Sequence, residues 1–169
     1  MRLFAAVLFS PRFTEAVTEV QSQLRAVCRR GNFTRLENLH LTLAFIGETD
    51  DLAGACRALE TLPPRPTFEI SLRGAGRFDE LHWVGLKESA PLAALADDVR
   101  CALRAAGFAI ERRAFSPHIT LVRQAELRSQ PRLCVPPASM TVTHISLMSS
   151  LRENGRLVYD EVFTRNITL

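Results

Sequence analysis

Two short segments of the chain place a titratable ring beside a hydroxyl group: His40-Leu41-Thr42-Leu43 and His118-Ile119-Thr120-Leu121. Each is expected to be a β-strand because apolar and β-branched residues dominate it. Side chains two positions apart in a strand share a face, so each histidine should project beside its threonine while the intervening residues enter the core. An imidazole donates or accepts a proton near neutral pH, so two such pairs indicate acid–base catalysis.

The two motifs belong to a longer internal repeat with an offset of 78 residues. The same offset brings the apolar run Leu3–Leu8 onto Leu81–Leu86, and the helix-like segment Phe13–Cys28 onto Pro91–Ala106. Each half therefore has the order strand, helix and His-x-Thr strand. Two copies are too few for a solenoid, so we expect two lobes that face each other across a cleft, each supplying one His-x-Thr pair.

Length and composition indicate an ordinary globular protein. With 169 residues, of which 47% are hydrophobic and 23% charged, the chain is expected to form one domain, 1–169, of two closely packed lobes that carry the motif strands 39–46 and 118–123. The net charge of +3 is compatible with an anionic substrate but does not require nucleic acid. The first apolar run is too short for a signal peptide or a membrane span, which predicts a cytoplasmic protein.

The four cysteines do not have the spacing of a metal site or of a disulfide framework, since no C-x-x-C pair occurs. Cys28, Cys56 and Cys101 fall in segments with apolar periodicity, which predicts buried free thiols. No group of Asp or Glu ligands accompanies the motifs, so we expect neither a metal nor another cofactor.

Residue patterns predict the elements that carry the motifs. Helices are expected from Ser10 to Gly31, from Asp50 or Asp51 to Leu62, and over Pro91–Gly107. The expected strands are Arg2–Phe9, Leu39–Ile46, Thr67–Arg73, Leu81–Lys87, His118–Arg123, Met140–Met148 and Leu157–Phe163, with a hairpin turn at Asn154-Gly155. The expected connections are Asn32–Asn38, Gly74–Arg77 and Arg128–Pro137. The predicted class is α+β, with two antiparallel sheets facing a central cleft and helices on their outer faces.

Only two of the four histidines are candidates for catalysis. His40 and His118 share the same hydroxyl offset and the same place in the repeat. His82 stands beside a tryptophan and is expected to be structural or partly exposed, and His144 has no counterpart in the repeat.

Two histidines on opposite sides of a phosphate suit in-line displacement at phosphorus. One ring removes a proton from the attacking water or hydroxyl, and the other protonates the departing oxygen. Thr42 and Thr120 would hydrogen-bond the non-bridging oxygens and hold the phosphorus between the rings. A zinc site at the histidines would lack a further ligand, and no G-x-S-x-G segment indicates a serine nucleophile.

The segments Asn38–Gly47 and Ser116–Arg123 resemble the paired motifs of the 2H phosphoesterases, and especially those of the bacterial and archaeal RNA 2′,3′-cyclic phosphodiesterases, also called 2′-5′ RNA ligases. The similarity extends to Arg2–Phe9, Gly76–Leu86 and Tyr159–Phe163. It implies a bilobal fold with both His-x-Thr pairs in a central cleft. It also implies metal-independent hydrolysis of a terminal 2′,3′-cyclic phosphate to a 2′-phosphate, and a capacity to form or reverse a 2′-5′ linkage.

The resemblance also suggests roles for individual residues. His40 is expected to be the general acid and His118 the general base. Arg123 is a candidate phosphate contact, although strict alternation places it opposite His118 unless the strand bends or bulges. Phe45, at the equivalent repeat position, is a candidate contact to a base or ribose.

The expected partner is an RNA or nucleotide that bears a 2′,3′-cyclic phosphate, bound by a monomer with no membrane and no obligate protein partner. Two alternatives stay open. Another 2H activity, on ADP-ribose 1″,2″-cyclic phosphate or on 2′-5′ oligonucleotides, would use the same residues. A non-catalytic module that binds RNA ends would use the histidines only to recognise phosphate.

Overall fold

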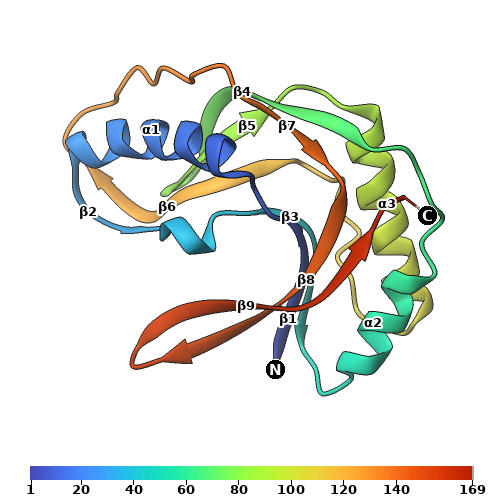
Figure 1. Cartoon of the computed structure of the whole chain (residues 1–169). Coiled ribbons are helices and arrows are strands. Elements are labelled where there is room, and N and C mark those ends of the chain that lie inside the picture. Colours follow the sequence, from blue (N-terminus) through green and yellow to red (C-terminus); the bar gives the residue numbers. More distant parts are fainter. Residues whose placement is uncertain (169) are drawn as a thin grey trace.

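The computed structural model describes residues 1–168, which form two antiparallel sheets and three α-helices (Figure 1). The four-stranded sheet has the order β3 (Leu41–Glu48), β1 (Arg2–Val7), β8 (His144–Glu153), β9 (Arg156–Asn166). The five-stranded sheet has the order β2 (Cys28–Phe33), β6 (His118–Leu127), β5 (Leu81–Leu86), β4 (Phe68–Phe78), β7 (Ser139–Val142). The predicted α+β class with two antiparallel sheets is confirmed.

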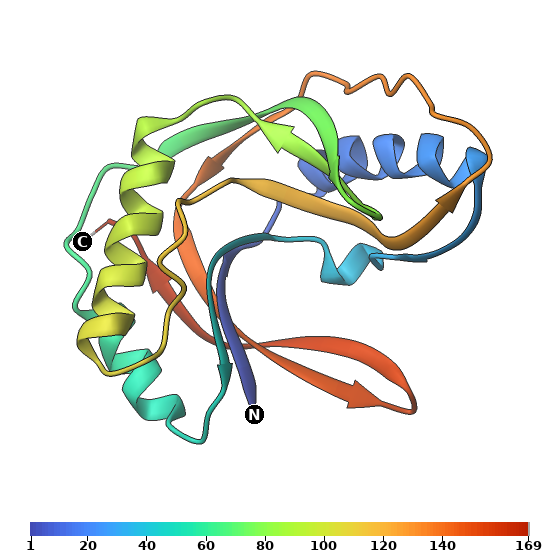
Figure 2. The ribbon, with the colours of Figure 1, turned by 180° about the vertical axis from the view of Figure 1, so that it is seen from behind.

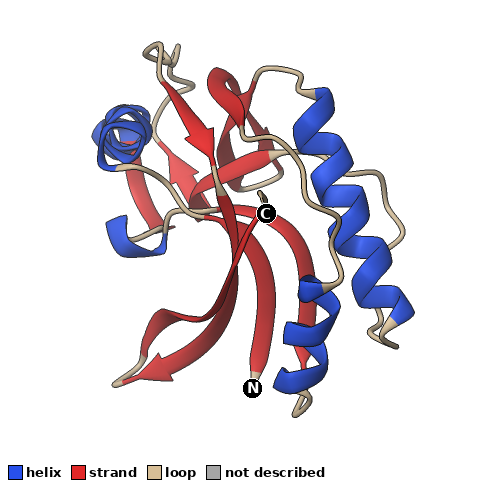
Figure 3. Ribbon diagram, turned by 45° about the vertical axis from the view of Figure 1, so that its right-hand side comes forward, coloured by secondary structure: helices blue, strands red, loops and turns tan. Residues whose placement is uncertain are grey.

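The helices are exchanged between the two sheets. The helix α1 (Pro11–Val27) follows β1 of the four-stranded sheet but packs on β6 and β2 of the five-stranded one. Conversely, α3 (Ala90–Ala105) follows β5 but packs on β3, with α2 (Leu52–Glu60) beside it. Figure 3 shows α1 on one side of the molecule and the α2–α3 pair on the other. Because each sheet is covered by a helix from the other half of the chain, the two lobes interlock.

The helices begin where the sequence predicts. The Ser10 hydroxyl accepts a hydrogen bond from the Phe13 amide, and Ser89 does the same at the start of α3, in both cases beside a proline in the first turn. Asp51, one of the two predicted caps of α2, accepts from the Gly54 amide at 2.8 Å. These caps satisfy amides that the helices cannot pair internally.

The predicted end of the first helix at Gly31 is wrong. The helix ends at Val27, and Cys28–Phe33 forms the edge strand β2, which pairs with β6. A Cβ at Gly31 would lie 2.7 Å from Val122 Cγ2, so glycine permits this close approach. The predicted connector therefore shortens to a few residues and a single 3₁₀ turn, Leu36–Asn38.

Two strand assignments also change. Gly74–Arg77 is not a loop, because β4 continues through it and pairs with β5. The predicted strand Met140–Met148 is interrupted at Thr143, where the chain passes from β7 in one sheet to β8 in the other. The Asn154-Gly155 hairpin is confirmed, with φ of 50° and 77°, and Figure 1 shows that β8 and β9 project from the body of the molecule.

One core lies between the sheets and their helices. The inward residues of both motifs, Leu41, Leu43, Ile119 and Leu121, are fully buried in it. The four cysteines are free, but Cys101 is exposed, which corrects its predicted burial; Cys28 and Cys56 are half-buried. Cys101 lies on the solvent side of α3, between the buried positions Val99 and Leu103. Within residues 1–168 the structure has no helix long and apolar enough to cross a membrane.

Candidate active site

The two motif strands come together where the sheets meet. β3 forms the edge of the four-stranded sheet, and it contacts β6 of the five-stranded sheet (Figure 2). His40 lies directly before β3, and His118 is the first residue of β6. Both rings are therefore held at the starts of strands.

The two histidines are anchored in the same way. Nδ1 of His40 lies 2.7 Å from the carbonyl oxygen of Asn38, and Nδ1 of His118 lies 2.8 Å from that of Ser116. A carbonyl oxygen only accepts, so Nδ1 carries the proton in each ring and Nε2 is left for chemistry. Nε2 of His40 lies 3.0 Å from the Thr42 hydroxyl, which confirms that this histidine and threonine share a side of the strand.

The surroundings of His40 lower the pKa of its imidazole. Burial is the largest cause, and the positive charges of Arg123 and His118 act in the same direction, against the hydrogen bond to Asn38. Arg123 and His118, both on β6, therefore act electrostatically on His40, which precedes β3 in the other sheet. An anion bound between them would oppose the lowering.

This lowered pKa makes stability depend on pH through His40. The unfolded chain binds the proton more readily, so the stabilisation is complete above about pH 6.5 and is lost as the pH falls through the folded-state pKa. We expect His40→Gln to reduce the loss of stability between about pH 7.5 and about pH 5, measured by urea unfolding. Wild type is the reference, and an equal loss in His40→Gln would contradict the prediction.

Each catalytic candidate has two aromatic neighbours that the sequence did not single out. The His40 ring lies 4.8 Å from Phe4 and 5.3 Å from Tyr159, between ring centroids. The His118 ring lies 5.3 Å from Phe78 and 6.4 Å from Trp83. Phe4 and Trp83 stand on the strands that precede each motif in the repeat, a signal that could have identified them. Tyr159 and Phe78 are brought in only by tertiary pairing.

Both motif strands contain a β-bulge at the equivalent position, and each bulge changes which side chains face the open side of the strand. Ala5 pairs with Ala44 and Ala6 with Thr42, so Leu43 is an extra residue in β3. In β6 the extra residue is Leu121, because His82 pairs with Val122 and Trp83 with Thr120. The two bulged leucines are equivalent in the 78-residue repeat. In each strand the bulged residue and the next one are both buried, so the alternation of faces reverses there.

The bulges place two further predicted residues on the open side. Phe45 and Arg123 both follow a bulge and are exposed, and together with Arg2, Phe4 and Tyr159 they line one pocket of about 570 Å³. The Arg2 guanidinium lies 4.9 Å from the centre of the Phe45 ring. The bulge at Leu121 is the condition under which Arg123 was expected to leave the face that strict alternation assigns to it, and Arg123 lies on the pocket side.

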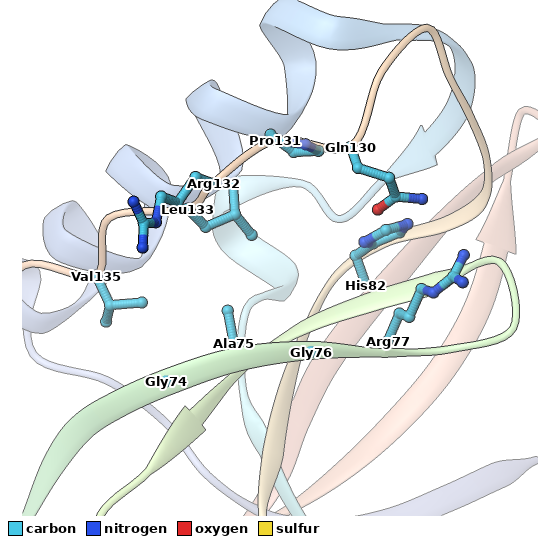
Figure 4. Close-up of a pocket in the computed structure, with 10 residues that line it drawn as sticks. All are labelled: Gly74, Ala75, Gly76, Arg77, His82, Gln130, Pro131, Arg132, Leu133 and Val135. Carbon is cyan, nitrogen blue, oxygen red and sulfur yellow. The ribbon is translucent and has the colours of Figure 1, made fainter.

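The remaining histidines lie outside this site. His82 is 7% exposed and points to the opposite side of β5 from Trp83, into a separate pocket of about 550 Å³ where Gln130 covers the ring and Arg77 lies alongside (Figure 4). Burial and Arg77 lower the pKa of His82. His144 is 2.9 Å from the Thr143 hydroxyl through Nδ1. Among residues 1–168, no three His, Cys, Asp or Glu side chains are grouped so that they could hold a metal ion.

Comparison with known proteins connects this geometry to a family. The family model described as 2′-5′ RNA ligase superfamily matches residues 8–154. The RNA 2′,3′-cyclic phosphodiesterase of Methanothermobacter thermautotrophicus is 31% identical over 183 residues, which cover 96% of this chain and 98% of that protein. The enzyme of the same name from Geobacillus stearothermophilus is 32% identical over 89% of this chain but only 52% of its own length, so this chain spans about half of that relative.

Solved structures agree with the sequence matches. Escherichia coli LigT without ligand superposes with a TM-score of 0.79 and 29% identity, covering 99% of this chain and 98% of LigT. LigT in complex with 3′-AMP superposes with a TM-score of 0.77 and 28% identity over the same shares. The matched span includes both His-x-Thr motifs, and the chain belongs to the 2′-5′ RNA ligase superfamily.

Proposed function

We propose that this protein hydrolyses a terminal RNA 2′,3′-cyclic phosphate to a 2′-phosphate by metal-independent acid–base catalysis between His40 and His118. The observation that carries the proposal is the matched anchoring of the two rings. Both donate Nδ1–H to a backbone carbonyl two residues earlier, and both leave Nε2 for proton transfer. Each ring is thus oriented for transfer at one nitrogen only.

The reaction needs one proton removed and one delivered. A neutral Nε2 takes a proton from water as the water oxygen attacks phosphorus opposite the 3′-oxygen. The bond between phosphorus and the 3′-oxygen breaks, and the other ring, protonated at Nε2, gives its proton to that oxygen. The products are a free 3′-hydroxyl and a 2′-phosphate, and exchange with solvent restores the two rings. With a ribose 5′-hydroxyl in place of water, the same displacement would form a 2′-5′ linkage, and its reversal would break that linkage.

The other predicted residues would hold the phosphate and its nucleotide. The Thr42 hydroxyl lies 3.0 Å from His40 Nε2, so a phosphate oxygen bound to it would sit beside the reacting nitrogen. Thr120 would do the same beside His118. Arg123, on the pocket side of β6, offers a planar fork of donors to phosphate oxygens. Phe45 offers an exposed aromatic face to a base or ribose.

We assign the acid role to His40 and the base role to His118. Burial and the neighbouring positive charges lower the pKa of His40, which makes the protonated ring a stronger acid toward the departing oxygen. The negative charge of a bound phosphate acts in the opposite direction and keeps the ring protonated until transfer. In the free protein the lowered pKa favours the neutral ring, so the acid role of His40 requires the bound phosphate to restore its proton.

The comparisons support an activity on RNA ends. The relatives from Methanothermobacter and Geobacillus are both called RNA 2′,3′-cyclic phosphodiesterases, and LigT has been solved with 3′-AMP, a nucleotide with its phosphate on the ribose ring. We extend this activity to the present chain as a monomer of two lobes that arose by duplication, with an RNA or nucleotide end as its partner.

We expect the purified protein, in the presence of EDTA, to convert an RNA with a 2′,3′-cyclic phosphate end into a product with a 2′-phosphate. The position of the phosphate is read by ³¹P NMR and by sensitivity to a phosphatase. ADP-ribose 1″,2″-cyclic phosphate and 2′-5′ oligoadenylate, assayed in parallel, should turn over more slowly. Faster turnover of either compound would favour that activity instead. Tight binding without turnover would favour the RNA-end binding module.

A further inference from the structure

The two β-bulges expose backbone carbonyls that helix side chains bind. Nε2 of Gln21, on α1, donates to the carbonyl oxygen of the bulged residue Leu121 at 2.9 Å. Nε of Arg100, on α3, donates to the carbonyl oxygen of the bulged residue Leu43 at 3.0 Å. A bulge disrupts the ladder and leaves backbone groups to be paired elsewhere, and buried groups of this kind must find partners. Each bulge is therefore completed from the helix that covers its sheet.

Each of these side chains also binds the segment that leads to the other motif. Gln21 donates its second Nε2 hydrogen to the Thr34 carbonyl oxygen at 2.7 Å, in the segment that leads to His40. Arg100 donates through Nη1 to the Arg113 carbonyl oxygen at 2.9 Å, in the segment that leads to His118. The two arrangements correspond approximately in the internal repeat: Gln21 and Arg100, like Thr34 and Arg113, are 79 residues apart, one more than the 78-residue offset of the motifs.

Additional contacts strengthen both attachments. The Thr34 amide donates to the same Leu121 carbonyl oxygen at 2.9 Å, and the Thr34 hydroxyl donates to the Thr120 carbonyl oxygen at 2.9 Å. The Arg100 guanidinium lies 5.2 Å from the ring centre of Phe115, three residues before His118. The backbone of Thr120 is thus bonded to Thr34, in the segment that leads to His40. The segment before His118 contacts Arg100, which also binds the strand after His40.

The exchange of helices explains why such cross-links exist. The helix α1 covers the sheet that holds His118, and in the chain it precedes His40, so a residue on α1 can contact both motif regions. The helix α3 covers the sheet that holds the strand after His40, and in the chain it precedes His118. We propose that Gln21 and Arg100 are positioning residues that set the separation and orientation of the two His-x-Thr pairs across the cleft. This inference rests on the proposed function, in which two rings must reach one phosphorus atom from opposite sides.

The expected consequence is a loss of turnover rather than of binding. Displacing a catalytic group by about 1 Å can lower the rate about 10²-fold. Gln21→Met keeps the length of the side chain and Arg100→Met keeps its aliphatic part, but each removes both side-chain hydrogen bonds to the two carbonyls. We expect each variant to lower kcat on the cyclic-phosphate RNA by about 10- to 100-fold and to change KM by less than about threefold. Arg100→Lys, which keeps one donor group, should restore part of kcat.

The same helices offer matched controls. Gln23, on α1, exchanges hydrogen bonds with the backbone of Cys134, in the connection after β6 and away from both motifs. Arg104, on α3, donates to the Glu111 carbonyl oxygen in the same loop as Arg113, but does not bond to Leu43. Gln23→Met and Arg104→Met should therefore keep kcat within about twofold of wild type, which is the ordinary size of a change remote from a site.

A second measurement does not depend on turnover. The C–H signals of the histidine rings, followed by NMR during a pH titration, should show the pKa of His40 rising toward its ordinary value in Gln21→Met and Arg100→Met, because looser placement weakens burial and the influence of His118 and Arg123. The two control variants should titrate like wild type. Unfolding in urea identifies any variant that is not folded. If Gln21→Met is not folded, the Arg100→Met variant tests the proposal, because Arg100 is only half-buried.

The outcomes separate the two hypotheses. If wild type does not hydrolyse the cyclic phosphate, the proposed function fails, and the titrations alone test the positioning role. If kcat of both folded variants stays within about twofold of wild type, or if the controls lose as much, the positioning role is overturned. Unchanged His40 titration in both folded variants would overturn it as well.

Discussion

His40→Ala and His118→Ala are each expected to lower kcat on an RNA 2′,3′-cyclic phosphate by about 10²- to 10⁴-fold, with EDTA present throughout. Each variant removes one of the two proton transfers while leaving the phosphate-binding hydroxyls in place. Alanine also removes the ring whose Nδ1 is bonded to a backbone carbonyl oxygen. Single-turnover assays on 5′-labelled RNA measure the loss directly.

The double variant should lose much less than the product of the two single losses, because the two rings act in one step. His144→Ala is the control, since His144, at the start of β8, bonds to Thr143 and to neither motif, and it should retain wild-type kcat. Retained activity in either single variant at matched folding would remove that histidine from the mechanism.

The same variants distinguish acid from base. A 4-nitrophenyl ester of a 3′-deoxynucleoside 2′-phosphate keeps phosphorus on the 2′-oxygen and loses a phenolate, which departs without a proton. The variant that lacks the general acid should therefore recover most of its relative activity on this ester, whereas the variant that lacks the base should not. We expect recovery in His40→Ala. Recovery in His118→Ala instead would reverse the assignment while preserving the two-histidine mechanism.

The second large effect concerns stability. Phe13→Ala is expected to lower the free energy of unfolding by about 3–5 kcal/mol. Phe13 lies in the first turn of α1 and is 0% exposed, with its ring centroid 5.0 Å from that of Phe9. The substitution leaves a cavity under the helix that covers the five-stranded sheet. Since a typical domain is stable by about 5–15 kcal/mol, this loss is a large share of the total, and urea unfolding measures it.

Phe45→Ala deletes the same ring at a position that is 48% exposed. It should change the free energy of unfolding by less than about 1 kcal/mol, because little apolar area leaves a buried environment. If Phe45 contacts the base or ribose, the variant should instead raise KM severalfold on the cyclic-phosphate RNA. A large loss of stability in Phe45→Ala, or no loss in Phe13→Ala, would contradict the difference in burial between the two phenylalanines.

Several features followed from the sequence alone because they depend on local chemistry. The two His-x-Thr segments, their spacing in the repeat and the resemblance they carry pointed to the family. Ser10 and the proline after it indicated where α1 begins, the predicted helix Pro91–Gly107 began within one residue of α3, and Asn154-Gly155 indicated the hairpin. Such signals reside in a few neighbouring residues, so no knowledge of distant partners is needed to interpret them.

Other features depended on partners far away in the chain. Arg123 faces the pocket only because Leu121 has no partner in β5, and a leucine in an apolar strand gives no local sign of a bulge. The strand β2 forms because β6 offers an edge to Cys28–Phe33, whose composition is polar. The extended segment divides at Thr143 because its first part, β7, pairs with β4 in one sheet and its second part, β8, pairs with β1 in the other.

The exchange of helices is the clearest example of what the tertiary structure decided. The amphipathic patterns of α1 and α3 require an apolar surface but do not specify which sheet provides it. Only the packed fold places Gln21 beside Leu121 and Arg100 beside Leu43. The sequence determined which residues can do the chemistry, through residue type and short-range spacing. The tertiary structure determined how those residues meet, because bulges, register and helix packing are set by long-range contacts.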